Sequence, residues 1–272
     1  MSNSYVINYC QQLLFNYFPV ILTTVFLLAI TVGFISLILQ LYITNRFIKK
    51  YLKNKVLLPD RLNKIVLKLN ISGKVDVVES EEHTSFCYGL LSPRICLSLK
   101  LVSSLNIKEL RAVLLHESSH LKNYDPLKMV ISKTFSSMFL FIPILKDLQR
   151  HYIFTREIAA DSLAVKNNGK AGLVSVLSKL LISNPPYFNL VATLDSGENL
   201  EKRILYLTGG QRKVVFKPSF LSISLSTFIV LFSMVLVNTP VYAVRADDSC
   251  KAKEEVNYSK DVIHTPANYT PK

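Results

Sequence analysis

The chain has 272 residues, of which 50% are hydrophobic and 19% charged, and its formal net charge is +13. The length allows one or two compact domains, and the composition fits a soluble portion attached to membrane segments better than a purely soluble enzyme. Nucleic-acid binding would require a basic face interleaved with aromatic residues on a recognisable module. The sequence offers none, so we expect no nucleic-acid partner.

The first predicted element is a transmembrane helix. No charged residue occurs from Met1 to Asn45, and the apolar run from Phe18 to Ile43 exceeds the roughly 20 residues that cross a hydrocarbon layer. A cleaved signal peptide is not expected, because the start has no basic residue and the apolar core is too long. We assign residues 1–45 to an outer N-terminal segment and the first transmembrane helix.

Basic residues predict the orientation of the chain in the membrane. A second charge-free stretch, Ser219 to Ala243, is also long enough to span the bilayer, so we place a second transmembrane helix at 218–243. Basic residues follow the first span and precede the second: Arg46, Lys49, Lys50, Lys53 and Lys55, then Arg212, Lys213 and Lys217. Because positively charged loops tend to stay cytoplasmic, we expect a multi-pass protein of the inner (plasma) membrane. Residues 46–217 are then cytoplasmic, and both termini, including a flexible tail at 244–272, lie outside.

The cysteines give little further information. Cys87 and Cys96 belong to the predicted cytoplasmic part and should stay reduced, and no Cys-x-x-Cys spacing typical of metal sites occurs. Two alternatives stay open for the outer cysteines. Cys10 and Cys250 form a disulfide in an oxidising compartment, or both remain thiols.

An amphipathic helix and a small sheet are predicted next along the chain. The helix opens at Pro59-Asp60, and its apolar residues have the i, i+3, i+4, i+7 spacing of one helix face: Leu62, Ile65, Val66 and Leu69. Two runs with β character follow, Val75 to Val78 and Ile95 to Leu99, with Phe86-Cys87-Tyr88 and turn residues between them. The expected fold class is therefore α+β, mainly helical, with a small β-sheet.

The following predicted helix carries a metal-binding pattern. It begins at Asn106, which can form a capping box with Glu109, and it contains His116-Glu117-Ser118-Ser119-His120. Two histidines four residues apart project from one helix face, so both imidazoles can reach one zinc ion at about 2.0–2.1 Å. Glu117 then stands beside the metal, where it can take a proton from zinc-bound water. The alternative is a set of ordinary polar residues on an exposed helix face, which the small number of histidines in the chain disfavours.

A catalytic zinc site needs a third protein ligand and leaves the fourth position to water. Glu157 is the candidate, in a helical stretch that ends near Asn167-Asn168-Gly169. Asp161, four residues later, can place a second carboxylate beside a histidine ligand and orient it. The alternative for Asp161 is a surface charge. For the group that stabilises the oxyanion, only His151 and Tyr152 lie nearby in sequence, and an ordinary surface role is favoured for both.

Between the two parts of this predicted site lies an uncharged run from Thr134 to Leu145. If this run crossed the bilayer once, Glu157 would emerge on the opposite side from the histidines and a shared metal could not bind. Runs of ten to fourteen apolar residues are more often re-entrant, interfacial or buried than spanning. We therefore predict a re-entrant hydrophobic hairpin at 134–145, broken by Pro143, and an active site close to the inner membrane surface.

Three blocks of the sequence resemble the membrane zinc-peptidase family of the BlaR/MecR-type β-lactam sensor-transducers, and more distantly the HtpX-like proteases. The blocks run from Ser85 to Leu97, from Leu110 to Asp125 and from Glu157 to Asp161, within about half of the chain. The resemblance implies a Zn²⁺ metalloendopeptidase whose site residues are the ligands His116, His120 and Glu157 and the catalyst Glu117.

The sequence also departs from that family. Its members carry additional membrane spans before the zinc domain and an outer penicillin-binding domain with Ser-x-x-Lys. Here one predicted span precedes the zinc domain and the tail contains no Ser-x-x-Lys, so we expect no penicillin-binding sensor domain. Leu200 to Leu207 looks like a further shared element, in which Arg203 has no assigned role.

The sequence thus predicts a membrane-bound zinc endopeptidase that cleaves a protein or peptide substrate at the cytoplasmic membrane face, in regulatory signalling. Residues 46–217 form its zincin-like metalloprotease domain. The predicted partners are the protein or peptide substrate and the lipid bilayer. The alternative is a non-proteolytic membrane signal transducer that uses the zincin-like fold as a docking scaffold. An intact Glu117 between the histidines argues against that alternative. The oligomeric state is not predicted.

Overall fold

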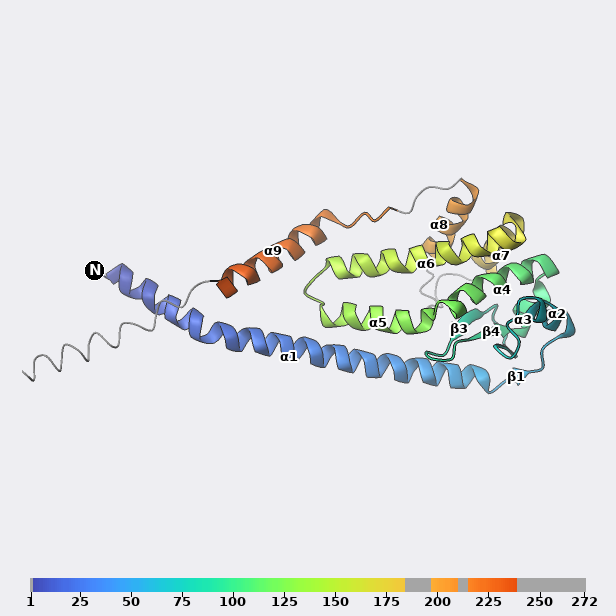
Figure 1. Cartoon of the computed structure of the whole chain (residues 1–272), viewed down its shortest axis with the longest axis horizontal. Coiled ribbons are helices and arrows are strands. Elements are labelled where there is room, and N and C mark those ends of the chain that lie inside the picture. Colours follow the sequence, from blue (N-terminus) through green and yellow to red (C-terminus); the bar gives the residue numbers. More distant parts are fainter. Residues whose placement is uncertain (1, 184–196, 210–214, 239–272) are drawn as a thin grey trace, which may run out of the picture. The chain divides into compact units, whose positions relative to one another are not determined.

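A computed structural model describes residues 2–183, 197–209 and 215–238 of the chain. The chain divides into two compact units, Leu28–Thr227 and a unit made of the two chain ends, Met1–Leu27 and Phe228–Lys272. The first unit holds the sheet and all predicted site residues, and the described residues of the second are helical (Figure 1). The predicted tail at 244–272 and Cys250 lie outside the described residues, as does the side chain of Cys10.

The longest element is α1 (Ser2–Leu52). Within the described part of the chain, its stretch Val20–Leu52 is the one helix long and apolar enough to cross a membrane, by length and composition. Many of its large apolar side chains are exposed, Phe26 and Phe34 among them. An apolar helix that the protein leaves uncovered fits a lipid environment. The second apolar helix, α9 (Phe220–Asn238), has a shorter apolar stretch, Phe220–Met234, so a second span remains a prediction.

A four-stranded mixed sheet follows α1 in the chain. Its strand order is β1-β2-β4-β3, with β1 (Lys55–Val56), β2 (Val75–Val78), β4 (Arg94–Ser98) and β3 (Ser85–Tyr88). β2 and β4 are parallel, whereas β3 is antiparallel to β4 with Phe86 opposite Cys96. The turn between β3 and β4 requires Gly89, whose φ is +88° and where a Cβ would meet the Ser92 carbonyl. Because β3 comes last in the strand order, it is an edge strand.

The main core lies between this sheet and four helices, α2 (Asp60–Lys68), α3 (Leu99–Ser104), α4 (Ile107–Lys122) and α7 (Lys170–Ser183). Its buried side chains come from all of them and include Leu62, Val77, Ile95, Leu97, Leu101, Leu110, Leu114 and Val176. The predicted capping box at the start of α4 is present, because Asn106 Oδ1 accepts from Glu109 N–H and Glu109 Oε2 accepts from Asn106 N–H, both at 2.9 Å. α4 is the most buried helix of the fold.

The chain reverses direction between α5 (Asp125–Met138) and α6 (Ile144–Asn168), which run antiparallel (Figure 1). The turn at residues 139–143 includes a hydrogen bond from Ile142 N–H to the Phe139 carbonyl. This reversal falls inside the uncharged segment 134–145, and its insertion into the bilayer remains a prediction. α6 begins well before the helical stretch recognised in the sequence. At its other end, Gly169 has φ +78° and ψ 164°, which is outside the left-handed helical region expected for a cap.

Two contacts fix the C-terminal half of α1 within the larger unit. Ser36 Oγ donates to Ser137 Oγ of α5 at 3.0 Å, and Gly33 lies so close to Met138 that an added Cβ would overlap that side chain. Farther along α1, aromatic rings pack on β3, with centroids 5.7 Å apart for Phe47 and Phe86. α1 therefore touches both the hairpin and the edge strand.

Candidate metal centre

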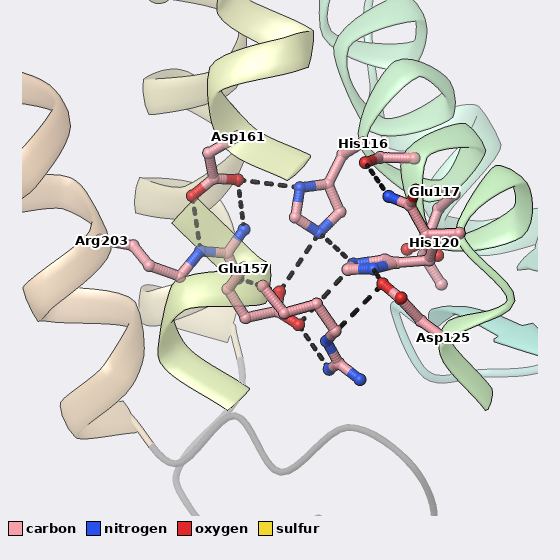
Figure 2. A network of polar contacts seen from close by, with 11 residues as sticks. His116, Glu117, His120, Asp125, Glu157, Asp161 and Arg203 are labelled. Atoms are coloured by element: carbon pink, nitrogen blue, oxygen red, sulfur yellow. Dashed lines mark hydrogen bonds and ion pairs between the residues drawn. The ribbon is translucent and has the colours of Figure 1, made fainter. Parts of the chain in front are cut away.

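Three buried side chains from two helices point toward one another. His116 and His120 come from α4 and Glu157 from α6, and one ligand atom from each lies within 4.8 Å of the others. The two Nε2 atoms are 3.1 Å apart, His116 Nε2 is 3.3 Å from Glu157 Oε2, and His120 Nε2 is 3.7 Å from Glu157 Oε1. Figure 2 shows both imidazoles and the carboxylate facing a common point. The structure thus brings together the three ligands predicted from the sequence.

The helix pair that carries these residues is closely packed. α4 makes its most extensive contact with α6, and fully buried alanines occur on both helices, at Ala112, Ala160 and Ala164. Small side chains let two helix axes approach closely. The separation of four residues within α4 places both imidazoles on the face turned to α6. The spacing within one helix and the small residues between the two helices therefore position the site.

Each imidazole also contacts a carboxylate through its other nitrogen. His120 Nδ1 is 2.6 Å from Asp125 Oδ2, and His116 Nδ1 is 2.8 Å from Asp161 Oδ1, a distance typical of an ion pair although its alignment falls short of a hydrogen bond. A carboxylate at Nδ1 favours the tautomer whose Nε2 lone pair faces the opposite side. Asp161 is 0% exposed, so the surface-charge alternative for this residue is wrong.

Two arginines to which the sequence assigned no role contact the carboxylates of this network. Arg203 of α8 (Gly197–Thr208) makes a bidentate contact with Asp161, with Nε 2.8 Å from Oδ2 and Nη2 2.7 Å from Oδ1, and its Nη1 is 3.4 Å from Glu157 Oε2. Arg156 Nη2 donates to Glu157 Oε1 at 2.6 Å, and its Nε is 3.9 Å from Asp125 Oδ2. Nothing local in the sequence distinguishes either arginine from a surface cation.

The charges of this network do not balance without a further cation. Four buried carboxylates, those of Glu117, Asp125, Glu157 and Asp161, stand against the two guanidinium groups. Two negative charges are therefore left over when both histidines are neutral, and buried charge without a counter-charge is costly. A divalent cation or two imidazolium protons would neutralise them.

The pKa directions agree with this account for the metal-free protein. Burial alone would lower the pKa of His116, but the Asp161 and Glu157 carboxylates raise it to about 10. His120 also has a raised pKa, because the carboxylates of Asp125 and Glu157 outweigh its burial. Burial would raise the pKa of Glu157, yet His116, His120 and Arg203 hold it well below its usual range. The site therefore attracts positive charge.

The donor set fits zinc. Catalytic zinc sites use three protein ligands, among them two histidines and a glutamate, with nitrogen and oxygen donors at about 2.0–2.2 Å, so neighbouring donors in a tetrahedral site are about 3.3–3.6 Å apart. The observed separations of 3.1, 3.3 and 3.7 Å are close to that range. Two neutral imidazoles with facing Nε2 lone pairs would repel each other, which a cation between them prevents. Of all described residues, this is the group of histidine, cysteine and acidic side chains that is arranged to hold a metal.

Glu117 connects the metal centre to the edge of the sheet. It is buried on α4 between the two histidines, and its Oε1 accepts a hydrogen bond from Ser85 Oγ of β3 at 2.5 Å. Ser98 N–H donates to the Thr84 carbonyl at 2.9 Å. Because hydrogen-bonded pairs alternate along antiparallel strands, the backbone groups of Ser85 and Cys87 point away from β4. The edge beside Glu117 thus presents outward N–H and C=O groups.

The two residues considered for oxyanion stabilisation are placed differently. The His151 ring packs against that of Phe216, with centroids 5.1 Å apart and the planes tilted by 54°. Tyr152 is half-buried, and its pKa is raised first by burial and then by the charge of Asp125. Its phenol therefore stays protonated at neutral pH.

Comparison with known proteins agrees with this site. The chain matches the family described as BlaR1 peptidase M56 over residues 11–207. It is 26% identical over 218 residues to the regulatory protein BlaR1 of Staphylococcus aureus, a match that covers 72% of this chain and 37% of that protein. The similarity therefore spans little more than a third of that relative. Since the family match covers well over half of the residues and includes the whole metal centre, the chain belongs to the BlaR1 peptidase M56 family.

Proposed function

We propose that this protein is a zinc-dependent endopeptidase that cuts a protein substrate at the cytoplasmic face of the membrane. The observation that supports this proposal most is the convergence of two Nε2 atoms and one carboxylate within 4.8 Å, in a buried network with two excess negative charges. His116, His120 and Glu157 would hold the zinc ion. Zinc bound there would polarise the scissile carbonyl and lower the pKa of a bound water to about 7.

The residues of the chain would then divide the remaining work. Glu117 takes the proton from the attacking water and delivers it to the leaving amine, a role that typically contributes about 10²–10⁴-fold to the rate. The Ser85 hydroxyl holds one oxygen of Glu117, so the carboxylate keeps its orientation. Asp125 and Asp161 hold the imidazoles through Nδ1.

The edge strand supplies a place for the substrate backbone. A peptide in extended conformation can pair with the outward N–H and C=O groups of Ser85 and Cys87, as in strand addition to a sheet edge. Ser85 also contacts Glu117. A peptide bound along β3 would therefore pass beside the catalytic carboxylate.

The membrane arrangement we propose has two spans, α1 and α9, with the metal centre on the cytoplasmic side and both termini outside. The lysines and arginines that follow the apolar part of α1 support this orientation. A regulatory setting is supported by the similarity to a regulatory protein.

Replacement of Glu117 by Gln tests the enzyme. Purified full-length protein, loaded with zinc and reconstituted in vesicles, is offered reduced casein as an unfolded probe, and cleavage is followed by mass spectrometry. We expect Glu117→Gln to lower the rate by about 10²–10⁴-fold with unchanged zinc content, because Glu117 is not a ligand. The matched control, Glu81→Gln, alters a fully exposed glutamate and should change nothing.

Two outcomes would contradict the proposal. Equal cleavage by the wild type and by Glu117→Gln would remove Glu117 from the chemistry. A wild type that retains zinc but cuts no probe would favour the alternative, a non-proteolytic transducer in which the fold serves as a docking scaffold.

A further inference from the structure

Three independent contacts indicate how far the metal centre lies from the membrane. The first runs through α1 and α5. Ser36 precedes Arg46, the first basic residue after the apolar stretch, by ten residues, or about 15 Å of helix. The hydrogen bond between Ser36 and Ser137 places Ser137 at the same depth. From Ser137 back to Asp125, α5 rises twelve residues, about 18 Å. Asp125, the partner of the His120 imidazole, is thus only a few ångströms beyond the level of Arg46.

The second contact runs through α6 and the start of α9. Ser219, one residue before α9, donates its N–H to Asp147 Oδ2 at 3.2 Å, and Ile144 N–H donates to Ser226 Oγ at 3.2 Å. The first turns of α6 therefore lie beside the first turns of α9. From Asp147 to Glu157 is ten residues, about 15 Å of helix. Glu157 lies at most this far on the cytoplasmic side of the level at which α9 begins.

The third contact is the aromatic packing between α1 and β3. Phe47 directly follows Arg46, and its ring lies 5.7 Å from that of Phe86. Ser85, the residue before Phe86, donates to Glu117. The proposed catalytic carboxylate is therefore separated from the end of the apolar stretch by two side-chain contacts. The first two routes put the metal centre between about 3 and 15 Å from the hydrocarbon boundary, in or just above a headgroup layer of about 5–8 Å, and the third agrees with a short separation.

The hairpin has the surface needed to hold the protein at this height. Large apolar side chains at and beside its tip are exposed, namely Ile131, Phe135, Leu140, Phe141 and Leu148. They lie level with the exposed apolar face of α1, because Ser137 and Met138 contact that helix. Lipid is the solvent that exposed apolar side chains at this level fit.

From these contacts we propose that the substrate is a membrane-anchored polypeptide, cut in the juxtamembrane segment that leaves the bilayer on the cytoplasmic side. This inference rests on the proposed endopeptidase function. An extended peptide rises about 3.3 Å per residue, so a cut between about 3 and 15 Å above the hydrocarbon falls within about five residues of the end of a span. The protein would then select the peptide bond that it cuts by the height of that bond above the membrane.

The height of the site can be measured without any cleavage. The chain contains no tryptophan, so single-tryptophan variants of the full-length protein report their own depth in vesicles of lipids brominated at defined positions. Three exposed positions serve: Phe141 at the hairpin tip, Tyr124 beside Asp125, and Ile107 at the far end of α4. Phe135→Trp is a second probe for the tip.

The expected quenching differs by position. Bromines within the acyl chains should quench Phe141→Trp and Phe135→Trp most, bromines near the headgroup should quench Tyr124→Trp, and Ile107→Trp should show no quenching. If the tip tryptophans are unquenched, or if Tyr124→Trp behaves like Ile107→Trp, the site is not at the membrane surface and the inference is overturned.

The substrate itself is tested with a synthetic probe in the same zinc-loaded vesicles. The probe joins a fixed apolar span to a tail of randomised sequence, and the same tail without the span is the control. Cuts mapped by mass spectrometry should fall within about five residues of the span, and the anchored tail should be cut at least about tenfold faster because anchoring raises its local concentration.

The outcomes separate the two proposals. Cuts spread evenly along the tail, or equal rates for the anchored and detached tails, overturn the juxtamembrane substrate while the endopeptidase stands. Cleavage that Glu117→Gln performs as fast as the wild type, or no cleavage of any probe, overturns the endopeptidase and the inference with it.

Discussion

At the metal centre each imidazole can bind either a proton or the metal at Nε2. Because the carboxylates raise the pKa of His116 to about 10, this residue is protonated at neutral pH in the metal-free protein, whereas an unfolded histidine has a pKa of about 6.5. Its contribution to stability is full below about pH 6.5 and is lost as the pH rises toward 10. Zinc requires the neutral imidazole, so zinc affinity should increase over the same window.

Calorimetry can test this exchange. Zinc binding at pH 7 should release about one to two protons, so the measured binding enthalpy should change linearly with the ionisation enthalpy of the buffer. The second histidine contributes because the pKa of His120 is also raised. An enthalpy that is the same in every buffer would show that the imidazoles are already neutral before zinc binds.

Arg203 neutralises the carboxylate that contacts His116. Replacement by Met would leave the fully buried Asp161 without its bidentate partner, so we expect zinc affinity to fall about 10–100-fold and the free energy of unfolding to fall by about 3–5 kcal/mol. For Arg203→Lys, zinc affinity and the free energy of unfolding should lie between those of the wild type and of Arg203→Met. Lysine keeps the positive charge but cannot make the bidentate contact of the planar guanidinium. Zinc titration and thermal melts measure both effects.

The matched control for Arg203 is a surface arginine. Arg150 is 81% exposed and pairs with Asp147 at 3.8 Å, so Arg150→Met should cost less than about 1 kcal/mol and leave zinc affinity unchanged. A stable Arg203→Met variant with wild-type zinc affinity would limit Arg203 to a role unrelated to the metal.

At the residue scale, the sequence predicted the parts of the site that follow from local spacing. His116, Glu117 and His120 lie on one helix, and Asp161 is one helical turn from Glu157, so periodicity alone relates them. Arg203 meets Asp161 across 42 residues. Local pattern carries no information about such a pair, and an isolated arginine is usually exposed. The arginines that neutralise the buried carboxylates could therefore be identified only from the structure.

At the element scale, the crossing of α1 and α5 depends on the absence of a side chain at Gly33. Gly33→Leu would overlap Met138, and overpacking of this kind costs about 1–3 kcal/mol. The double variant with Met138→Ala should recover most of this loss, which a double-mutant cycle of unfolding free energies would measure.

The control for this crossing is a neighbouring residue on α1. Ile35 is exposed, so Ile35→Leu should have little effect in detergent. If Gly33→Leu is as stable as the wild type, the hairpin does not pack on α1 in solution.

Elements with strong local signals were predicted, and those without were not. The capping box fixed the start of α4, and the apolar periodicity gave α2 (Asp60–Lys68). β1 has two residues, too few for a pattern, and β3 has four, in which the buried Phe86 and Cys87 are adjacent and do not alternate with polar residues. α6 was recognised only in its second half, because its first turns mix charged residues with the end of an apolar run. Pairing with β2 holds β1 in place, and tertiary contacts with α1, α4 and α9 hold β3 and the start of α6.

At the scale of the whole molecule, zinc should contribute to stability by mass action. A ligand that binds only the folded protein at 1,000 times its Kd stabilises it by about 4.1 kcal/mol. Removal of zinc with a chelator should therefore lower the Tm, and zinc addition should restore it. The Tm of Glu117→Gln should respond to zinc as that of the wild type does. The Tm of His116→Ala should not respond, because this substitution removes a proposed zinc ligand. A Tm that does not respond to zinc in the wild type would contradict a metal centre built into the core.

The dependence of the site on α8 has a consequence for the biogenesis of the protein. Helices α4 and α6, with the three proposed ligands, precede Arg203 in the chain, and the fully buried Asp161 contacts that arginine through both carboxylate oxygens. A growing chain that ends before α8 has its histidines and glutamate but lacks half of its guanidinium counter-charge. Completion of the candidate metal centre is thereby postponed until the chain has been synthesised through α8, so a shorter nascent chain should bind zinc more weakly than the full-length protein.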